Sequence, residues 1–277
     1  MNSIHPLTER GQRPSDAPNR TPVLLRLLRD HRRLEQHQRN LGHARRWVEA
    51  TDVALHRAQL HIDTVLGSLN RSSDHGDSEL ESTTTSLRAV MNAGIDQRLL
   101  FAGTAIAAVA FDDQGVYQGN DLPVLHQLTD DIVVPFGFTG SQVFLADSSR
   151  PANTLLTTLS ELRACPEAGD PELAHRRSQL AQETGQIGEK VRRAVEQLQR
   201  QRNRLADLDA STSEAMVAVY SQWIEAHGRI DADDVNDRTS EASVDATLQA
   251  TDRALANSMA EFFGYPPGSS TRSRWTS

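Results

Sequence analysis

A repeat of apolar side chains every seven residues is the feature that most constrains how this chain can fold. The repeat has no miss over seven positions, which are Leu27, Leu34, Leu41, Val48, Leu55, Ile62 and Leu69. A companion row, three residues after each of these positions, is small or apolar from Ala44 onward and polar at Asp30 and His37. Such a repeat is typical of a helix that packs along a coiled-coil seam. The sequence therefore predicts one helix over 22–69, about 70 Å long at ~1.5 Å per residue.

A second seam in the C-terminal half offers a partner for the first. Its members are spaced alternately by four and three residues, in the order Ile187, Val191, Ala194, Leu198, Gln201, Leu205 and Leu208. Gln201 is the one polar member, and the helical pattern runs from about Pro171 to a break at Gly228. Packing of the two seams against each other is the economical arrangement. It predicts a mainly α fold, an elongated multi-helix rod with a coiled-coil-like core and both chain ends near one end of the rod.

The remaining segments divide the chain around these two seams. A break at 70–77, rich in Ser, Asp and Gly, separates the first helix from a second over 78–98, which we expect to fold back as an antiparallel hairpin. A short helix fits 152–164 and a last helix fits 240–263. The expected organisation is a disordered segment (1–20), a helical hairpin (21–98), a small β subdomain (99–150), returning helices (151–262) and a disordered tail (263–277).

The inserted segment changes period from helix to strand. Ala105–Phe111 reads as a strand, 112–115 as a turn with the expected residue types, and 116–118 as a strand that pairs back. Further strands are expected over 131–136 and 142–145, separated by two glycines. A segment of about fifty residues is too small for a sheet with a large core of its own. We therefore expect a satellite β subdomain carried by the helices.

Composition and charge exclude several classes of partner. Hydrophobic residues make up 38% and aromatic residues 5% of the 277 residues, which suits long helices with narrow apolar seams. A net charge of −8 argues against nucleic acid. No apolar run is long enough to cross a membrane, and the first 20 residues lack the apolar core of a cleavable secretory signal. Arginines over 21–57 and acidic residues over 231–245 form either solvated helix faces or a basic face for an acidic partner.

The sequence contains no motif that points to catalysis. Cys165 is the single cysteine, so no internal disulfide forms. The acidic run after His227 lacks the glycine and closing glutamate of a calcium-binding loop, which favours a solvated loop over a metal site. Nucleophile elbows, phosphate-binding loops and zinc-protease patterns are absent from the sequence. We therefore predict no enzyme activity, no cofactor and no metal.

Three stretches of sequence carry a resemblance to a known family. They are the turn Gly11–Pro18, the first-helix segment around Gln38–Leu41, and the segment Asn92–Thr104 continued by 111–120 and 140–144. On these residues the chain resembles the flagellin-like family of flagellar hook–filament junction proteins (hook-associated protein 3). The residues that match the family pattern are Pro14, Ser15, Asp16, Arg39, Asn40, Arg98, Phe101, Gly103, Tyr117 and Gly119.

The resemblance implies a structural subunit with a flagellin-type core. Such a subunit is exported by the flagellar type III apparatus, joins a ring at the junction of hook and filament, and acts through subunit packing without catalysis. The implied partners are other junction proteins, the hook protein, flagellin and a cytoplasmic export chaperone. Two alternatives stay open: a flagellin-like filament subunit, and an intracellular coiled-coil adaptor derived from this family. Family members carry longer terminal helices than 1–10 and 263–277 offer, so we expect these helices to be missing here.

Overall fold

Long helices and a small amount of β structure make up the computed structural model of this chain. The structure describes residues 21–69, 76–106, 109–147, 150, 152–164 and 171–228. Its principal helices are α1 (Thr21–Leu69), α2 (Gly76–Met91), α4 (Leu155–Ala164) and α5 (Pro171–Gly228). The predicted mainly α fold class is confirmed. The chain divides into two compact units, 36–212 and a smaller one formed by 1–35 with 213–277, and α1 and α5 contribute to both.

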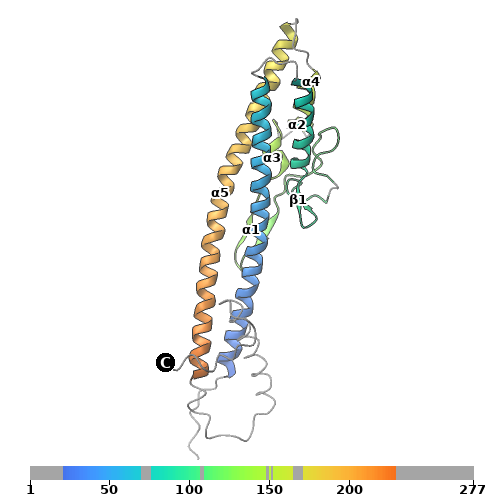
Figure 1. The fold of residues 1–277 in the computed structure, drawn as a ribbon. Helices are drawn as coiled ribbons and strands as arrows, with labels where there is room; N and C mark the ends of the chain where they lie inside the picture. The colour runs from blue at the N-terminus through green and yellow to red at the C-terminus, as the bar shows by residue number, and fades with distance from the viewer. Residues whose placement is uncertain are drawn as a thin grey trace, which may run out of the picture. The chain divides into compact units, whose positions relative to one another are not determined.

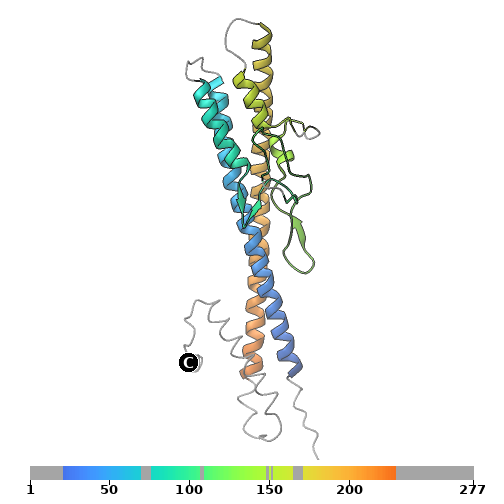
Figure 2. The same cartoon turned by 90° about the vertical axis from the view of Figure 1, so that its right-hand side faces the viewer.

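In the larger unit, α5 packs along the apolar seam of α1 (Figures 1 and 2). Ile62 of α1 approaches α5 so closely that a Cβ added at Gly188 would lie 3.1 Å from its Cγ2 atom. Arg202 of α5 donates a hydrogen bond to Asp52 of α1 at 3.1 Å, beside the buried face. Side chains of both seams share one continuous core. This packing is the arrangement that the two sequence repeats predict.

The second helix is shorter than predicted. It ends at Met91, and residues 94–98 of the expected helix form instead, together with Leu99, the antiparallel hairpin of β1 (Gly94–Ile95) and β2 (Arg98–Leu99). The two turn residues, Asp96 and Gln97, have φ angles of 49° and 63°. A turn with positive φ at both central positions matches the twist of a two-residue β-hairpin, which is why the chain reverses here. Helix α4, expected over 152–164, begins at Leu155 and packs on α2, where Arg163 contacts Glu81 at 3.0 Å.

The β subdomain has fewer strands than predicted. The strand expected over 131–136 is present as β4 (Val133–Pro135), which pairs antiparallel with β3 (Leu125–Gln127). The expected strand 105–111 is wrong in its described part, where a single bridge between Phe111 and Tyr117 closes the predicted turn.

The strand expected over 142–145 is also wrong. The chain forms the short helix α3 (Gly140–Phe144) there, and the side chain of Gln142 accepts a hydrogen bond from the backbone N–H of Thr139 at the helix start. This contact at the first turn favours a helix, and it outweighs the short apolar run that suggested a strand.

The smaller unit has a separate apolar cluster. Its buried members, drawn from α1 and α5, are Leu27, Leu34, Met216, Val219 and Tyr220. His31 lies among them, 3% exposed, with its Nε2 atom 3.1 Å from the Tyr220 hydroxyl. Burial lowers the pKa of His31, and the Glu35 carboxylate opposes that effect. The neutral imidazole is therefore buried among the apolar side chains of this cluster.

Several predicted features lie outside the described residues. They are the segment 1–20, Cys165, the acidic run 231–245, the last helix over 240–263 and the tail 263–277. Across the ranges that the structure does describe, none of the helices is both long and apolar enough to cross a membrane.

Candidate functional site

The three parts of the third family-like stretch, 92–104, 111–120 and 140–144, converge on one cluster beside α1 and α2. We call it the motif cluster, and its members are Asn92, Phe101, Gly103, Phe111, Tyr117, Gly119, Asn120, Gly140 and Phe144. Tyr117 lies at its centre, with its hydroxyl 2.9 Å from the carbonyl oxygen of Phe101 and 3.0 Å from that of Asn120. The backbone N–H of Gly140 donates to the same Phe101 carbonyl at 2.7 Å. Burial raises the pKa of Tyr117 to about 12, so the phenol remains a protonated donor.

Aromatic rings fill the interior of the motif cluster. Phe144 packs edge-on against Phe101 at a centroid distance of 5.0 Å and against Phe111 at 5.9 Å. The ring of Tyr117 lies 5.1 Å from that of Phe111. Edge-to-face pairs at these distances are the favoured geometry for aromatic rings. The cluster is thus a small aromatic core that joins three segments distant in sequence.

Glycines in the motif cluster stand where a side chain would not fit. Gly103 has a φ of 66°, and a Cβ there would lie 2.4 Å from the Asn120 carbonyl oxygen. At Gly140 an added Cβ would lie 2.6 Å from the Tyr117 ring, and at Gly119 it would lie 2.4 Å from the Tyr117 hydroxyl. Real Cβ atoms do not approach other atoms this closely. The packing around Tyr117 therefore accounts for these glycines without any chemical role.

Asn92 connects the end of α2 to the inserted segment. Its Oδ1 atom accepts hydrogen bonds from the backbone N–H groups of Ala110 at 2.7 Å and Phe111 at 2.8 Å. Its Nδ2 atom donates to the Phe111 carbonyl at 2.8 Å. Buried backbone groups without hydrogen-bond partners destabilise a fold, and the Asn92 side chain supplies a partner to three of them. In the sequence Asn92 stands only at the start of a motif, and no pattern there predicts this role.

Two polar side chains of α5 form hydrogen bonds with backbone groups of the β subdomain. Lys190, the only lysine of the sequence, donates to the carbonyl oxygens of Leu145 at 2.8 Å and Ala146 at 3.1 Å. The Oε1 atom of Gln201 accepts a hydrogen bond from the backbone N–H of Gly137 at 3.3 Å. The polar position in the second seam is therefore a contact to the subdomain. A polar residue at a seam position was the one signal that pointed to it.

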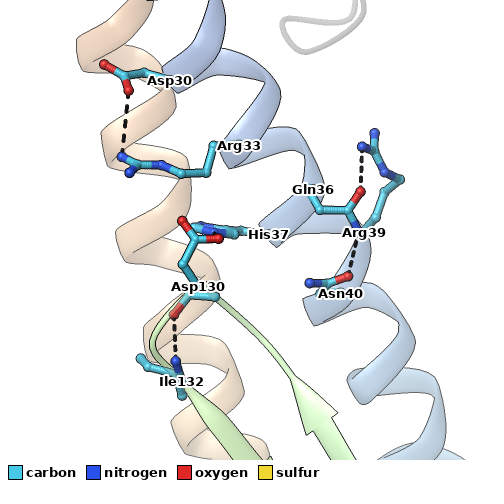
Figure 3. Close-up of polar contacts among 9 residues, drawn as sticks. Asp30, Arg33, Gln36, His37, Arg39, Asn40, Asp130 and Ile132 are labelled. Carbon is cyan, nitrogen blue, oxygen red and sulfur yellow. Dashed lines mark hydrogen bonds and ion pairs between the residues drawn. The ribbon is translucent and has the colours of Figure 1, made fainter.

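The β3–β4 hairpin rests on α1 near the polar start of the first seam. His37 of α1 lies 3.4 Å from the carboxylate of Asp130, which belongs to the loop between the strands (Figure 3). The ring of His126 lies 5.5 Å from the ring of Trp47. Burial lowers the pKa of His126, and the charges of Arg98 and His43 add to that effect. The polar companion residue His37 thus marks where the hairpin contacts the helix.

The structure also places the other residues singled out from sequence. Eleven residues of the two seams are buried: Leu27, Leu34, Leu41, Val48, Leu55, Ile62, Ile187, Val191, Ala194, Leu198 and Leu205. Leu208 is partly buried against the same core, and the side chain of Leu69 lies outside the described residues.

The residues that match the family pattern fall into two groups. Phe101, Gly103, Tyr117 and Gly119 are brought together in the motif cluster, whereas Arg39 and Arg98 are exposed and Asn40 is half-buried. Arg39 donates to the Gln36 side chain at 2.9 Å, and that side chain donates to Asn40 at 2.8 Å (Figure 3). Pro14, Ser15 and Asp16 lie outside the described residues.

The chemistry of the motif cluster is that of packing and hydrogen bonding. Its polar side chains are engaged with backbone groups at 2.7–3.2 Å. In the described ranges, no three His, Cys, Asp or Glu side chains gather closely enough to hold a metal ion. The arrangement fixes the shape of the β subdomain on the helices.

These features place the chain among mainly α proteins in which long packed helices carry a small β subdomain. Three solved structures share the fold. A protein described as a flagellar hook-associated protein from Vibrio parahaemolyticus is 19% identical, with a TM-score of 0.68 over 75% of this chain and 97% of that chain. FlgL from Bacillus cereus is 17% identical, with a TM-score of 0.59 over 72% and 97%. The flagellar junction protein FlgL from Legionella pneumophila is 11% identical, with a TM-score of 0.54 over 73% and 99%.

No protein-family model and no curated protein sequence matches the chain. The similarity to the three solved structures is therefore a similarity of fold.

Proposed function

We propose that this protein is a structural subunit of the bacterial flagellum at the junction of hook and filament, where it acts by packing against other subunits. The observation that carries the proposal is the shared fold, because nearly the whole length of each similar chain, 97–99%, aligns with this one. Those proteins are described as hook-associated or junction proteins. Fold alone does not define function, so a second line of support is needed.

The motif cluster supplies that second line of support. The sequence pattern that resembles the junction-protein family corresponds to residues that pack together, among them Phe101, Gly103 and Tyr117. A pattern required by the packing of the subdomain accompanies the subdomain, so its presence favours the same architecture in this chain. The exposed residues Arg39 and Arg98 match the pattern without packing inside the unit. They are candidates for contacts with neighbouring subunits.

The proposal includes export and assembly. The subunit leaves the cell through the flagellar type III apparatus, associates with further copies in a ring, and contacts other junction proteins, the hook protein and flagellin. A cytoplasmic chaperone holds it before export. Catalysis, a cofactor and a metal have no part in this function. The fold and the sequence resemblance support each part of this proposal.

Deletion of the gene tests the junction role. We expect a deletion strain to assemble hooks, to lack attached filaments and to release filament monomers into the medium, and we expect the wild-type chain to restore filaments. Sheared flagella from the complemented strain should contain the protein. Normal filaments in the deletion strain would contradict the junction role.

The same fractions separate the two alternative functions. A filament subunit would be distributed along the whole filament and would be abundant in the sheared fraction. An adaptor would be found only in the cytosol of a motile strain. Immunogold labelling distinguishes a junction band from labelling along the filament.

A further inference from the structure

A largely apolar groove of about 470 Å³ lies on the larger unit, between α1, α2 and the β1–β2 hairpin. Its lining includes Arg46, Ala50, Val53, Arg57, Val90 and Ile95. The four α1 residues are spaced by four, three and four residues and so form one face of the helix. Val53 is 51% exposed in the groove although it is a large apolar residue. Exposed apolar surface bordered by charged residues is typical of a docking surface.

A second exposed apolar surface lies on the β3–β4 hairpin. Alternate residues of each strand face away from the core, so Leu125 is 62% exposed and Val133 is 52% exposed, whereas Val134 is buried. Pro135 is paired with Leu125 across the strands and is also exposed. We call these three residues the hairpin face. An outward-facing apolar surface on a two-stranded hairpin remains uncovered in the described structure.

The groove and the hairpin face have complementary charges. Arg46 and Arg57 line the groove together with a single acidic residue, Glu49. The loop that ends the hairpin carries Asp130 and Asp131. Opposite charges at the rim of an apolar contact fix its register and steer association. The apolar part of each surface supplies the burial, and the charges decide the orientation.

The two surfaces lie on different sides of α1. The hairpin contacts α1 through His126 and Trp47, whereas the groove uses the row that contains Arg46 and Val53. Figure 2 shows the hairpin on one side of α1 and α2 on the other, and Figure 1 agrees. One copy therefore cannot place its own hairpin face into its own groove.

We propose that the hairpin face of one copy of this chain docks into the α1–α2 groove of the next copy. Leu125 and Val133 enter beside Val53, and Asp131 lies against Arg57. Because two different surfaces meet, the contact is heterologous and generates a ring or an open helical array. The inference rests on the proposed function, which it deepens by naming the contact between copies. Strands of three residues bury little area, so we expect a weak contact that becomes effective through repetition in an assembly.

Cysteine crosslinking of the full chain tests the contact directly. In a Cys165→Ser background, Val53→Cys protein is mixed with Leu125→Cys protein and oxidised. The matched control replaces Val53→Cys by Leu60→Cys, because Leu60 is 65% exposed on the same helix but does not line the groove. We expect a crosslinked dimer from the first pair and little from the second. Equal yields from the two pairs, or no dimer from either, would overturn the proposal.

Sedimentation velocity provides a second test that does not depend on cysteine chemistry. Val53→Asp should weaken self-association by about tenfold or more, because a charge would enter an apolar contact. Arg57→Asp and Asp131→Arg should each weaken it by about two- to fivefold, and the two variants mixed should recover the lost affinity. Unchanged association of Val53→Asp, a chain that stays monomeric, or a failed recovery would contradict the contact. Binding of the groove to an unrelated protein but not to a second copy would also overturn it.

The cellular assay keeps this inference separate from the proposed function. If the deletion strain lacks filaments and the Val53→Asp chain restores them fully, the junction role is supported and the groove contact is contradicted. If the deletion strain has normal filaments, the junction role falls whatever the crosslinking result.

Discussion

The seam of α1 and the motif cluster are held together in different ways. Along the seam, side chains of one class recur every seven residues, and each packs against a partner helix of similar pattern. In the motif cluster, single residues join segments far apart, as when Tyr117 donates a hydrogen bond to Phe101 or Asn92 donates one to Phe111. The seam depends on the hydrophobicity of many interchangeable residues. The cluster depends on the identity of a few, so the two regions should respond differently to mutation.

A substitution that disrupts the seam is expected to have the largest effect on stability. Leu55 is fully buried on α1, and Leu55→Asp would place an unpaired carboxylate in the core of the larger unit. We expect a loss of about 4 kcal/mol or more in the free energy of unfolding, with loss of helical signal. Urea titration followed by far-ultraviolet circular dichroism measures both. Leu60→Asp is the matched control on the same helix, and its exposed position predicts a change within about 0.5 kcal/mol. A Leu55→Asp protein with wild-type melting would show that the seam is not packed.

A smaller effect is expected when a single atom is added to the motif cluster. A Cβ at Gly140 would lie 2.6 Å from the Tyr117 ring and 2.7 Å from the Phe111 ring. Gly140→Ala should therefore destabilise the β subdomain by about 1–3 kcal/mol, since rings or backbone must shift.

The measurement for Gly140→Ala is amide hydrogen exchange, read separately for the subdomain and for α1. Faster exchange confined to the subdomain is expected. Gly42→Ala is the control, because a Cβ at Gly42 meets nothing within 4 Å, and alanine in a helix interior adds about 0.5–1 kcal/mol of stability. Equal losses in both regions would contradict the separation of cluster and seam.

A substitution in the β1–β2 turn should stabilise the protein. Gln97 has a φ of 63°, a conformation that costs a residue with a Cβ about 1 kcal/mol. Gln97→Gly should recover a large part of that cost, because glycine is favoured at the second position of this turn. The midpoint of urea unfolding should rise. Gln97→Ala keeps the strain and should show no gain, and a gain from alanine equal to that from glycine would refute the strain argument.

The smallest expected effect concerns acid and the apolar cluster of the smaller unit. Burial lowers the pKa of His31 in the folded chain. In the unfolded chain the imidazole takes up a proton near its ordinary pKa of 6.5, whereas in the folded chain it does so only at lower pH. The contribution of His31 to stability is therefore complete above about pH 6.5 and is lost as the pH falls through its lower folded pKa.

Thermal unfolding at pH 7.5 and 5.5 tests this expectation for His31. The drop in melting temperature should be smaller in His31→Leu, which places an apolar side chain in the same cluster and cannot be protonated. An equal drop in both proteins would assign the acid sensitivity elsewhere, for example to His126, whose pKa is also lowered by burial.

Helices α1 and α3 illustrate which parts of the fold can be predicted from the sequence. The extent of α1 was predicted to within one residue, because its apolar period is sustained over seven repeats. Gln142–Leu145 is a short apolar run, and periodicity cannot distinguish a buried helical turn from a strand at that length. The end of α2 was missed for a related reason, because the turn at Asp96 and Gln97 lacks the glycine that usually marks such a hairpin.

The sequence by itself determined the two seams and hence the mainly α fold, since periodic burial is a local property of each helix. Only the tertiary structure decided which residues act as connectors. Asn92, Lys190 and Gln201 are ordinary polar residues in the sequence, and their importance comes from backbone groups 18 to 64 positions away. The same holds for the groove and the hairpin face, because each is formed by segments that meet only after folding. Long-range hydrogen bonds and shared surfaces leave no period in the sequence.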